Sequence, residues 1–389
     1  MKHVTAVIGG HYGDEGKGKV VDFLAPEFDL VMRFNGGPNA GHTVVADGKT
    51  YKLHHIPSGI LHPNTINLIG PGCVINPDKF IEEVTILTAA GVDLSNLHIS
   101  DRAHLILPRH IRQDEEYDKE RNFGTTKQGI WPVYSDKVAR NGVRVGDIYG
   151  PAAPRWASSE WMMSLSPFIC DALDVIRKVD SILLEGSLGV MRDIDWGIYP
   201  YVTSSSCLPA VPGVPAPTRI IGVFKAYCTS IGAGPFPTEI EGSLADRLRE
   251  KGGEYGTTTG RPRRIGWFDA VAAKYAAEVA GFTELAITKL DVLEGFDEVK
   301  ICVGYEAGGK MTTKMLPTEG LLHARPIYED WPGWNWKLYS PNAHYFLRRI
   351  AELIGVRVST VGFGPERGAV YTLTPWTQEG FKWAYEQPI

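Results

Sequence analysis

The chain of 389 residues carries a formal net charge of −5, with 43% hydrophobic and 22% charged residues. Its length suits one large α/β domain or two ordinary ones, and its composition is that of a globular protein rather than a disordered or membrane-embedded one. The acidic balance provides no polycationic surface, which argues against long nucleic acids as partners. The five cysteines are far apart and never form a CxxC pair, so we expect no disulfide framework, no zinc site and a reducing cytoplasm. The N-terminal apolar run is too short for a signal peptide or a membrane span, so we expect neither export nor a membrane partner.

The expected elements alternate between strands and helices along the chain. A β-branched run predicts a strand over residues 4–8, and a glycine-rich turn then leads into a helix beginning at Lys19. A second helix is expected from Asp78, and an alanine-rich helix over residues 270–280 should end at Gly281. Apolar runs typical of buried parallel strands occur at residues 182–184, 220–224, 285–287 and 356–361. Between them, glycine- and proline-rich loops are expected at residues 208–218 and 232–237, so the pattern predicts an α/β fold.

Polar, glycine-rich segments are scattered from residue 9 to residue 368, with no repeat or low-complexity linker between them. One site assembled from many loops explains this distribution better than two independent domains. We therefore expect residues 1–389 to form a single domain.

The segment GDEGKGK, residues 13–19, is typical of a phosphate-binding loop. Between a strand and a helix, its backbone N–H groups and the helix N-terminus would point at phosphate oxygens, while Lys17 would neutralise charge. The segment departs from the Walker motif, because Gly18 stands where Ser or Thr should follow the lysine. On its own, such a pattern is more often a glycine-rich turn with solvated charges.

Three further segments carry binding chemistry. The segment NGGPNAGHT, residues 35–43, presents His42, although an isolated histidine is more often structural than catalytic. The segment GTTTGRPRR, residues 256–264, combines hydroxyls with guanidinium groups suited to carboxylates or phosphates, with a solvated basic loop as the alternative. The segment TKLD, residues 288–291, looks like a guanine-reading motif: Asp291 would accept from the guanine N1–H and 2-amino group, and the Lys289 stem would cover the ring.

Taken in order, these motifs are similar to those of the adenylosuccinate synthetase family, and the match covers nearly the whole chain. The other matching segments are GTTKQGIWPVYSDKVARNGVR at 124–144, DIDWGIYPYVTSS at 193–205, VFKAY at 223–227, GAGPFPTE at 232–239, TTTGRPRRIGWFDA at 257–270 and TKLDVLEG at 288–295. The resemblance implies one large α/β domain, with a twisted, mostly parallel central sheet flanked by helices and a variant P-loop. It also implies a dimeric, cytoplasmic ligase that depends on Mg²⁺ and GTP.

The implied reaction is IMP + L-aspartate + GTP to adenylosuccinate + GDP + phosphate, through a 6-phosphoryl nucleotide. A purine 6-oxo group is a poor leaving group, so it must become a phosphate before an amine displaces it. By resemblance, Asp14 removes the N1 proton and His42 acts as general acid at O6 and the transferred phosphoryl group. Lys17, together with Mg²⁺ held by Asp14 and the Gly41 carbonyl, would offset the charge that develops there.

The resemblance also assigns three sets of binding residues. The purine nucleotide would contact Asn39, Thr126, Arg140, Leu188, Thr203 and Ile231, with Arg140 contributed by the second subunit of a homodimer. L-aspartate would contact Thr258, Thr259, Gly260, Arg261 and Arg263. GTP would contact Gly13, Glu15, Gly16, Lys17, Gly18, Gly41, Thr43, Lys289, Asp291, Gly364 and Pro365.

Three departures from the family pattern lie beside the implied nucleobase. Leu188 stands where the family carries Gln or Asn, residues 11–12 are His-Tyr instead of Gln-Trp, and the stretch after residue 206 is shorter and lacks the usual glycines. An apolar side chain cannot replace the hydrogen bonds of an amide.

The departures leave the purine substrate open. The alternative is dGMP, as in phage-type relatives that form 2-amino-2′-deoxyadenylosuccinate, with ATP or dATP as an alternative donor. Asp14 favours IMP, because characteristic members of that branch have a small residue there. A GTP-binding regulatory module is a more remote alternative that would leave His42 and the arginine cluster without a task. A further alternative is a variant of the active site without catalysis. We expect IMP and GTP.

Overall fold

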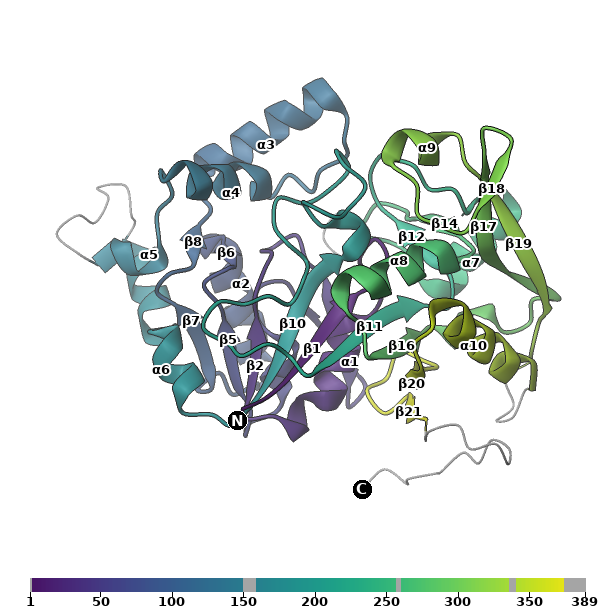
Figure 1. Cartoon of the computed structure of the whole chain (residues 1–389). Helices are drawn as coiled ribbons and strands as arrows, with labels where there is room; N and C mark the ends of the chain where they lie inside the picture. The colour runs from purple at the N-terminus through teal and green to yellow at the C-terminus, as the bar shows by residue number, and fades with distance from the viewer. Residues whose placement is uncertain (1, 150–158, 257–259, 336–340, 374–389) are drawn as a thin grey trace.

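The computed structural model describes residues 2–149, 159–256, 260–335 and 341–373. Its centre is a twisted ten-stranded sheet with the order β21-β20-β16-β11-β1-β10-β2-β5-β7-β9 (Figure 1). Every neighbouring pair in this sheet is parallel except β20 and β21, which are antiparallel. The mostly parallel α/β fold expected from the sequence is therefore confirmed.

The strands of the central sheet are β1 (His3–Gly9), β2 (Leu30–Arg33), β5 (Ile66–Ile69), β7 (Leu97–Ser100), β9 (Ile169–Cys170), β10 (Ser181–Gly189), β11 (Arg219–Lys225), β16 (Glu284–Thr288), β20 (Val358–Gly362) and β21 (Val370–Thr372). The smaller sheets are formed by β3 (His42–Ala46) with β4 (Lys49–Leu53), β6 (Val74–Ile75) with β8 (His104–Leu105), β12 (Cys228–Ser230) with β13 (Glu239–Ile240) and β14 (Arg264–Gly266), and β15 (Phe268–Asp269) with β17 (Glu298–Ala307), β18 (Lys310–Thr312) and β19 (Arg325–Pro332).

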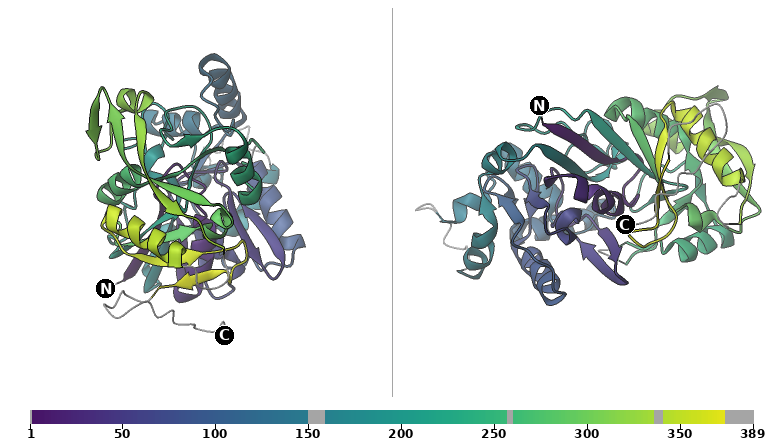
Figure 2. Two further views of the ribbon diagram at one scale, coloured as in Figure 1. Left: turned by 90° about the vertical axis from the view of Figure 1, so that its right-hand side faces the viewer. Right: turned by 90° about the horizontal axis from the view of Figure 1, so that it is seen from below.

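The helices are α1 (Lys17–Leu24), α2 (Pro77–Ala89), α3 (Pro108–Arg121), α4 (Ile130–Ala139), α5 (Ser159–Leu165), α6 (Ala172–Arg177), α7 (Ser243–Gly252), α8 (Ala270–Ala280), α9 (Thr318–Leu322) and α10 (Pro341–Ile354). Helices α2 to α6 gather at one end of the central sheet, whereas α7, α9, α10 and the sheet of β17 to β19 gather at the other (Figures 1 and 2). Among the described residues, no helix is both long and apolar enough to cross a membrane.

Both faces of the central sheet are covered, as a parallel sheet requires. Along β1, Val4, Ala6 and Ile8 belong to a core that includes α8 and α10, whereas Val7 belongs to a core formed with α1. This alternation follows from the two-residue period of a strand. The continuous apolar runs of the sequence are therefore strands buried on both faces.

Local sequence signals set the ends of the helices. Helix α8 begins after Asp269, whose side chain accepts from the N–H groups of Val271 and Ala272 at 3.1 and 3.0 Å, and ends at Gly281 with φ of 67°. This is the helix predicted over residues 270–280. Helix α1 begins two residues earlier than predicted, at Lys17 rather than Lys19.

Candidate active site

Three of the predicted binding segments lie at the carboxyl ends of parallel strands of the central sheet, and Ile231 follows β12 of a smaller antiparallel sheet. The phosphate loop follows β1, Leu188 lies in the last residues of β10, Ile231 lies just beyond β12, and Lys289 directly follows β16. In open α/β sheets, ligands bind in the crevice outside the carboxyl ends of the strands. The topology of the sheet therefore brings these segments together from distant parts of the chain.

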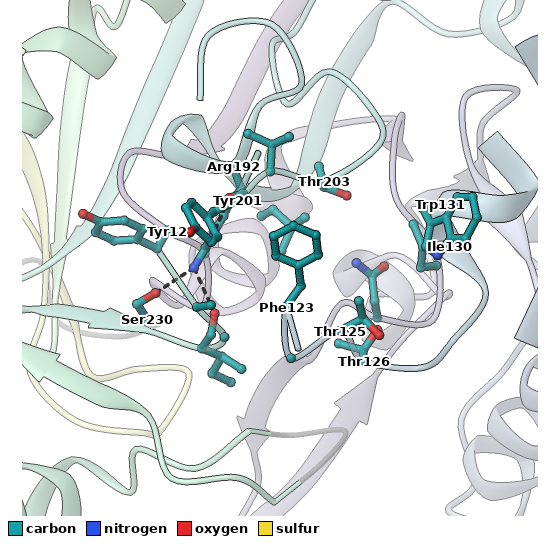
Figure 3. Close-up of a pocket in the computed structure, with 18 of the residues that line it drawn as sticks. Tyr12, Phe123, Thr125, Thr126, Ile130, Trp131, Arg192, Tyr201, Thr203 and Ser230 are labelled. Carbon is teal, nitrogen blue, oxygen red and sulfur yellow. Dashed lines mark hydrogen bonds between the residues drawn. The ribbon is translucent and has the colours of Figure 1, made fainter. Parts of the chain in front are cut away.

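A cavity of about 440 Å³ opens at this edge of the sheet (Figure 3). The predicted site residues that line it are Gly13, Asp14, Asn39, Thr126, Leu188, Thr203, Ile231 and Arg263. Residues that the sequence did not single out complete the wall: the aromatic side chains of Tyr117, Phe123, Trp131 and Tyr201, and the guanidinium group of Arg192. Five of the six predicted nucleotide contacts thus share one cavity with Asp14.

The phosphate loop is organised around Glu15. Its carboxylate accepts from the N–H of Gly13 at 2.8 Å and forms a buried ion pair with Lys17, with Nζ and Oε2 2.7 Å apart. The Thr288 hydroxyl donates to the Glu15 carbonyl at 2.6 Å, which ties the loop to the end of β16. Gly16, with φ of 90°, lets the chain pass from the loop directly into α1.

His42 is the first residue of strand β3. Its Nδ1 lies 2.5 Å from Oε1 of Glu185, which also accepts from the hydroxyl and the N–H of Ser58 at 2.6 and 2.9 Å. Burial lowers the pKa of His42 even though Glu185 opposes the shift. The pKa of Glu185 is also lowered, because His42, Arg33 and Ser58 outweigh the effect of burial. Glu185 therefore fixes the imidazole and leaves Nε2 free of this contact.

Close packing explains why glycine stands at position 18, where the Walker motif has Ser or Thr. A β-carbon at position 18 would lie 2.7 Å from the β-carbon of His42. Because real Cβ atoms do not approach so closely, Ser or Thr at this position would displace the histidine. Glycine here allows α1 and His42 to meet.

A chain of ion pairs around the buried carboxylate of Glu254 connects the predicted catalytic, aspartate and guanine segments. Arg263 lies 2.9 Å from Asp14 and 2.6 Å from Glu254, and the same Glu254 carboxylate lies 2.7 Å from Lys225 and 3.1 Å from Lys289. These three cations lower the pKa of Glu254, although burial opposes them. One carboxylate therefore holds three cations from three strands or loops.

The predicted guanine pocket contains an acceptor without a donor. Oδ1 of Asp291 is buried and accepts no hydrogen bond from the described residues. Burial also raises the pKa of this carboxyl group. Nearby, Lys19 donates to the carbonyl of Gly364 at 2.6 Å, which places Gly364 and Pro365 beside α1. A buried acceptor left unpaired in this way is typical of a ligand contact.

The remaining predicted residues are placed as follows. Thr258 and Thr259 lie outside the described residues, and Gly260 adjoins them with φ of 66°. Arg261 donates to the Gly124 carbonyl at 3.1 Å. Arg140 is exposed at the end of α4 and does not line the cavity, Thr43 is exposed on β3, and Gly41 directly precedes that strand.

Sequence reasoning missed Glu185, Glu254 and Arg192. Glu185 did leave a signal, because it interrupts the apolar run of β10 and is buried. A charged residue inside a buried strand is rarely left unpaired. Arg192 and Glu254 left no comparable signal, since neither lies within a strand.

The fold and the cavity define an α/β protein with a candidate ligand pocket at the carboxyl edge of its sheet. A sequence model of the family described as Adenylosuccinate synthetase matches residues 6–157 and 155–371. The chain belongs to the adenylosuccinate synthetase family, whose members are ligases that form a C–N bond with GTP as co-substrate. The predicted family and enzyme class are therefore confirmed, and the reading as a purely regulatory GTP-binding module is set aside.

Two curated relatives show how much of the chain is shared. The adenylosuccinate synthetase of Streptococcus gordonii is 42% identical over 419 aligned residues, covering 93% of this chain and 96% of the relative. That of Listeria monocytogenes serovar 1/2a is 42% identical over 423 aligned residues, covering 95% and 98%.

Two solved structures are similar in fold. Fully ligated adenylosuccinate synthetase from Plasmodium falciparum has a TM-score of 0.86 and 32% identity, covering 96% of this chain and 100% of that chain. The succinoaminodeoxyadenylate synthetase PurZ of cyanophage S-2L, bound to dGMP and dATP, has a TM-score of 0.66 and 24% identity, covering 96% of both chains. The likeness to the phage enzyme concerns the fold alone.

Proposed function

We propose that the protein joins L-aspartate to C6 of IMP and hydrolyses GTP, forming adenylosuccinate, GDP and phosphate. The observation that carries this proposal is one cavity lined by Asp14, Arg263 and five of the six residues predicted to contact the nucleotide. The family membership and the 42% identity to adenylosuccinate synthetases support the same reaction.

In the proposed mechanism, Asp14 takes the N1 proton of the purine, which makes O6 nucleophilic toward the γ-phosphorus of GTP. His42 presents Nε2 as the general acid at O6 and the phosphoryl oxygens. Glu185, 2.5 Å from Nδ1, stabilises the imidazolium form and fixes the ring. Burial lowers the pKa of His42, and the Glu185 carboxylate opposes this shift by stabilising the protonated ring.

Lys17 and Mg²⁺ would offset the negative charge of the transferring phosphoryl group. Mg²⁺ is usually held by one or two carboxylates together with substrate phosphates, so the carboxylate of Asp14 and the carbonyl of Gly41 are a suitable protein contribution. Asp14 retains 30% side-chain exposure, which leaves it accessible to such a ligand. Bound Mg²⁺ would supply Lewis-acid stabilisation of phosphate charge.

Arg263 and Arg261 would bind the carboxylates of L-aspartate, together with Thr258, Thr259 and Gly260. A guanidinium group binds a carboxylate through two parallel N–H donors, and Arg263 already lies 2.9 Å from the Asp14 carboxylate. Aspartate binding would then compete with Asp14 for Arg263 and release the Asp14 carboxylate for its task as base.

The active unit would be a homodimer of single-domain chains, in the cytoplasm. Arg140 matches a nucleotide phosphate contact of the family but is exposed and outside the cavity of its own chain. A second subunit that supplies Arg140 accounts for this placement.

A second candidate reaction uses dGMP and forms 2-amino-2′-deoxyadenylosuccinate, with ATP or dATP as a possible donor in place of GTP. The observation that favours it is Leu188, which lines the cavity without a polar atom. An amide at this position would have bonded near the purine six-position.

Measuring phosphate release with different substrates distinguishes the two candidate reactions. Purified protein would be supplied with L-aspartate, Mg²⁺ and GTP, and with IMP or dGMP as the acceptor, and product would be identified by mass. We expect turnover with IMP and GTP, and roughly 10⁴-fold less with ATP, because adenine offers an unprotonated N1 to Asp291. Preference for dGMP would overturn the IMP assignment, and no turnover with any combination would overturn the ligase mechanism.

A further inference from the structure

Arg192 is an arginine in the wall of the nucleotide cavity, at the end of the short helix η5 (Val190–Arg192) that follows β10. Its Nη1 donates to the carbonyl of Tyr201 at 2.6 Å, and its Nη2 donates to the Ser230 hydroxyl at 2.7 Å and the Ile231 carbonyl at 2.9 Å. Its guanidinium group also lies 5.5 Å from the centroid of the Tyr12 ring. Figure 3 shows the side chain directed toward Ser230, beside Tyr12 and Tyr201.

The positive charge of Arg192 has no carboxylate partner among the described residues. Arg263, the other arginine of the cavity, is paired with both Asp14 and Glu254. A guanidinium group has more N–H donors than the three bonds of Arg192 use. Burial lowers the pKa of Arg192 to about 10, so the side chain remains charged at neutral pH. A cation with spare donors in the wall of a cavity can donate to acceptors of a bound ligand.

Leu188, on the same segment, adds no hydrogen-bonding group to this wall. It lines the cavity, and its φ of 62° places it in the left-handed region. The end of β10 and η5 therefore present one apolar side chain and one side chain that can only donate. This part of the wall is suited to acceptors and apolar edges of a ligand.

We propose that Arg192 determines which purine the cavity accepts, and that it selects against nucleotides with a 2-amino group. This inference rests on the proposed function. The 2-amino group of a purine can only donate hydrogen bonds, and so can the guanidinium group of Arg192. If the two groups face each other, the N–H groups of each lack an acceptor. A hypoxanthine base carries only hydrogen at C2 and avoids this conflict. Arg192 thus favours IMP, where Leu188 alone would leave the base undetermined.

The test compares IMP with GMP, which differ only in the 2-amino group. Wild-type protein should have the higher kcat/KM with IMP, and Arg192→Met should reduce the IMP-to-GMP ratio by at least about tenfold. Arg192→Lys, which keeps a charged donor, should retain most of the preference. Arg192→Gln, which adds a carbonyl acceptor, should also lose the preference for IMP. This variant provides the test if Arg192→Met does not fold.

The matched control is Arg247→Met. Arg247 lies 4.2 Å from the centroid of the Phe296 ring and donates to the Gly295 carbonyl at 2.7 Å, but it does not line the cavity. Its loss should leave the IMP-to-GMP ratio unchanged. If Arg192→Met and Arg192→Gln lower turnover of IMP and GMP by the same factor, Arg192 only holds the loops together and the proposal is wrong.

Equilibrium dialysis with IMP and GMP, without GTP or aspartate, provides an independent readout of the same ratio. If wild-type protein turned over neither nucleotide, the proposed function would fail, but the binding ratios of wild type and variants would still decide the role of Arg192. Unchanged ratios in dialysis would overturn that role, whatever the reaction catalysed.

Discussion

Each of the two proposed acid–base residues has one charged partner: Asp14 lies 2.9 Å from Arg263, and His42 lies 2.5 Å from Glu185. If they act as base and acid, Asp14→Ala and His42→Asn should each lower kcat by roughly a hundredfold or more, with nucleotide binding retained. Steady-state kinetics and equilibrium dialysis would measure both effects.

Asp47→Ala is the control for the aspartate variant, because Asp47 also has a positive φ, 53° against 60° for Asp14, but is exposed in the turn between β3 and β4. His323→Asn removes an exposed imidazole and controls for the histidine variant. Near-normal kcat in either site variant would show that its assigned role is wrong.

His11 makes the stability of the fold sensitive to acid. Burial lowers its pKa from 6.5 to about 4, although the Asp269 carbonyl and Glu15 oppose the shift. The pKa of His11 is lower in the folded chain than in the unfolded chain. Between pH 6.5 and pH 4 the unfolded chain therefore binds more protons than the folded chain, so the free energy of unfolding decreases as the pH falls. Between pH 7 and pH 5, this group alone should cost about 2 kcal/mol.

His11→Gln introduces the residue typical of the family at this position and removes the titrating group. Urea unfolding at pH 7 and pH 5 should show a smaller loss of stability for this variant than for wild type. His323→Gln, at an exposed position, should lose as much as wild type. Equal losses for wild type and His11→Gln would contradict the assignment.

Candidate site residues could be predicted from the sequence only where they lie in short motifs. Asp14, Lys17 and Asn39 lie in glycine-rich motifs, so residue type and order could nominate them as candidates, and Asp14 and Asn39 line the cavity. The partners Glu185 and Glu254 could not be paired in advance, because Glu185 meets His42 143 positions away, and Glu254 meets Lys225 29 positions away. Such contacts depend on how the strands are ordered in the sheet, which local patterns do not encode.

At the scale of elements, helix α8 has a buried charged cap. Asp269 accepts from the N–H groups of Val271 and Ala272 and from the Tyr305 hydroxyl at 2.7 Å, and burial raises its pKa to about 6. Asp269→Ala should cost about 2 kcal/mol, because it removes the cap and leaves the hydroxyl without its acceptor. Asp269→Asn should cost less than about 1 kcal/mol at pH 7, because it keeps an acceptor and removes a buried charge.

Urea unfolding measures these differences in the free energy of unfolding. Asp171→Ala is the matched control, since Asp171 caps α6 by accepting from the Leu173 N–H at 2.9 Å but is exposed. Asp171→Ala should reduce the free energy of unfolding by less than Asp269→Ala does. Equal losses for the Asn and Ala variants at position 269 would mean that the cap acceptor is not what stabilises α8.

The elements themselves were largely predictable. The helix over residues 270–280 and the strand cores at 182–184, 220–224 and 285–287 were found as expected, because they combine strong periodicity or apolar runs with clear end signals. The start of β20 at Val358 rather than residue 356 was not predictable, since Val356 only packs against the core from outside the ladder. The pairing order of the ten strands was likewise beyond local patterns.

For the whole molecule, the position of Arg140 leads to a prediction about assembly. If Arg140 serves the site of the other subunit, a mixture of Arg140→Leu and His42→Asn chains should regain activity, because each hybrid dimer has one intact site. With random exchange of subunits, about a quarter of wild-type activity should return. Phosphate release before and after mixing measures the recovery.

A mixture of His42→Asn with Asp14→Ala is the control, because both residues belong to the same chain's site and every site in the hybrid keeps a defect. It should recover nothing. Absence of recovery in the Arg140 mixture, with subunit exchange demonstrated by a tagged chain, would refute an arginine that acts in trans.

Among the described residues, seven non-glycine positions have a positive φ, and four of them, Asp14, Arg140, Leu188 and Lys289, are candidate site residues. Each such backbone costs about 1 kcal/mol relative to an ordinary conformation, and glycine or asparagine would relieve it. Directed evolution for heat resistance should therefore select substitutions at these positions. A library screened for melting temperature alone should accumulate glycine or asparagine at residues 14, 140, 188 and 289 and yield robust but inactive proteins.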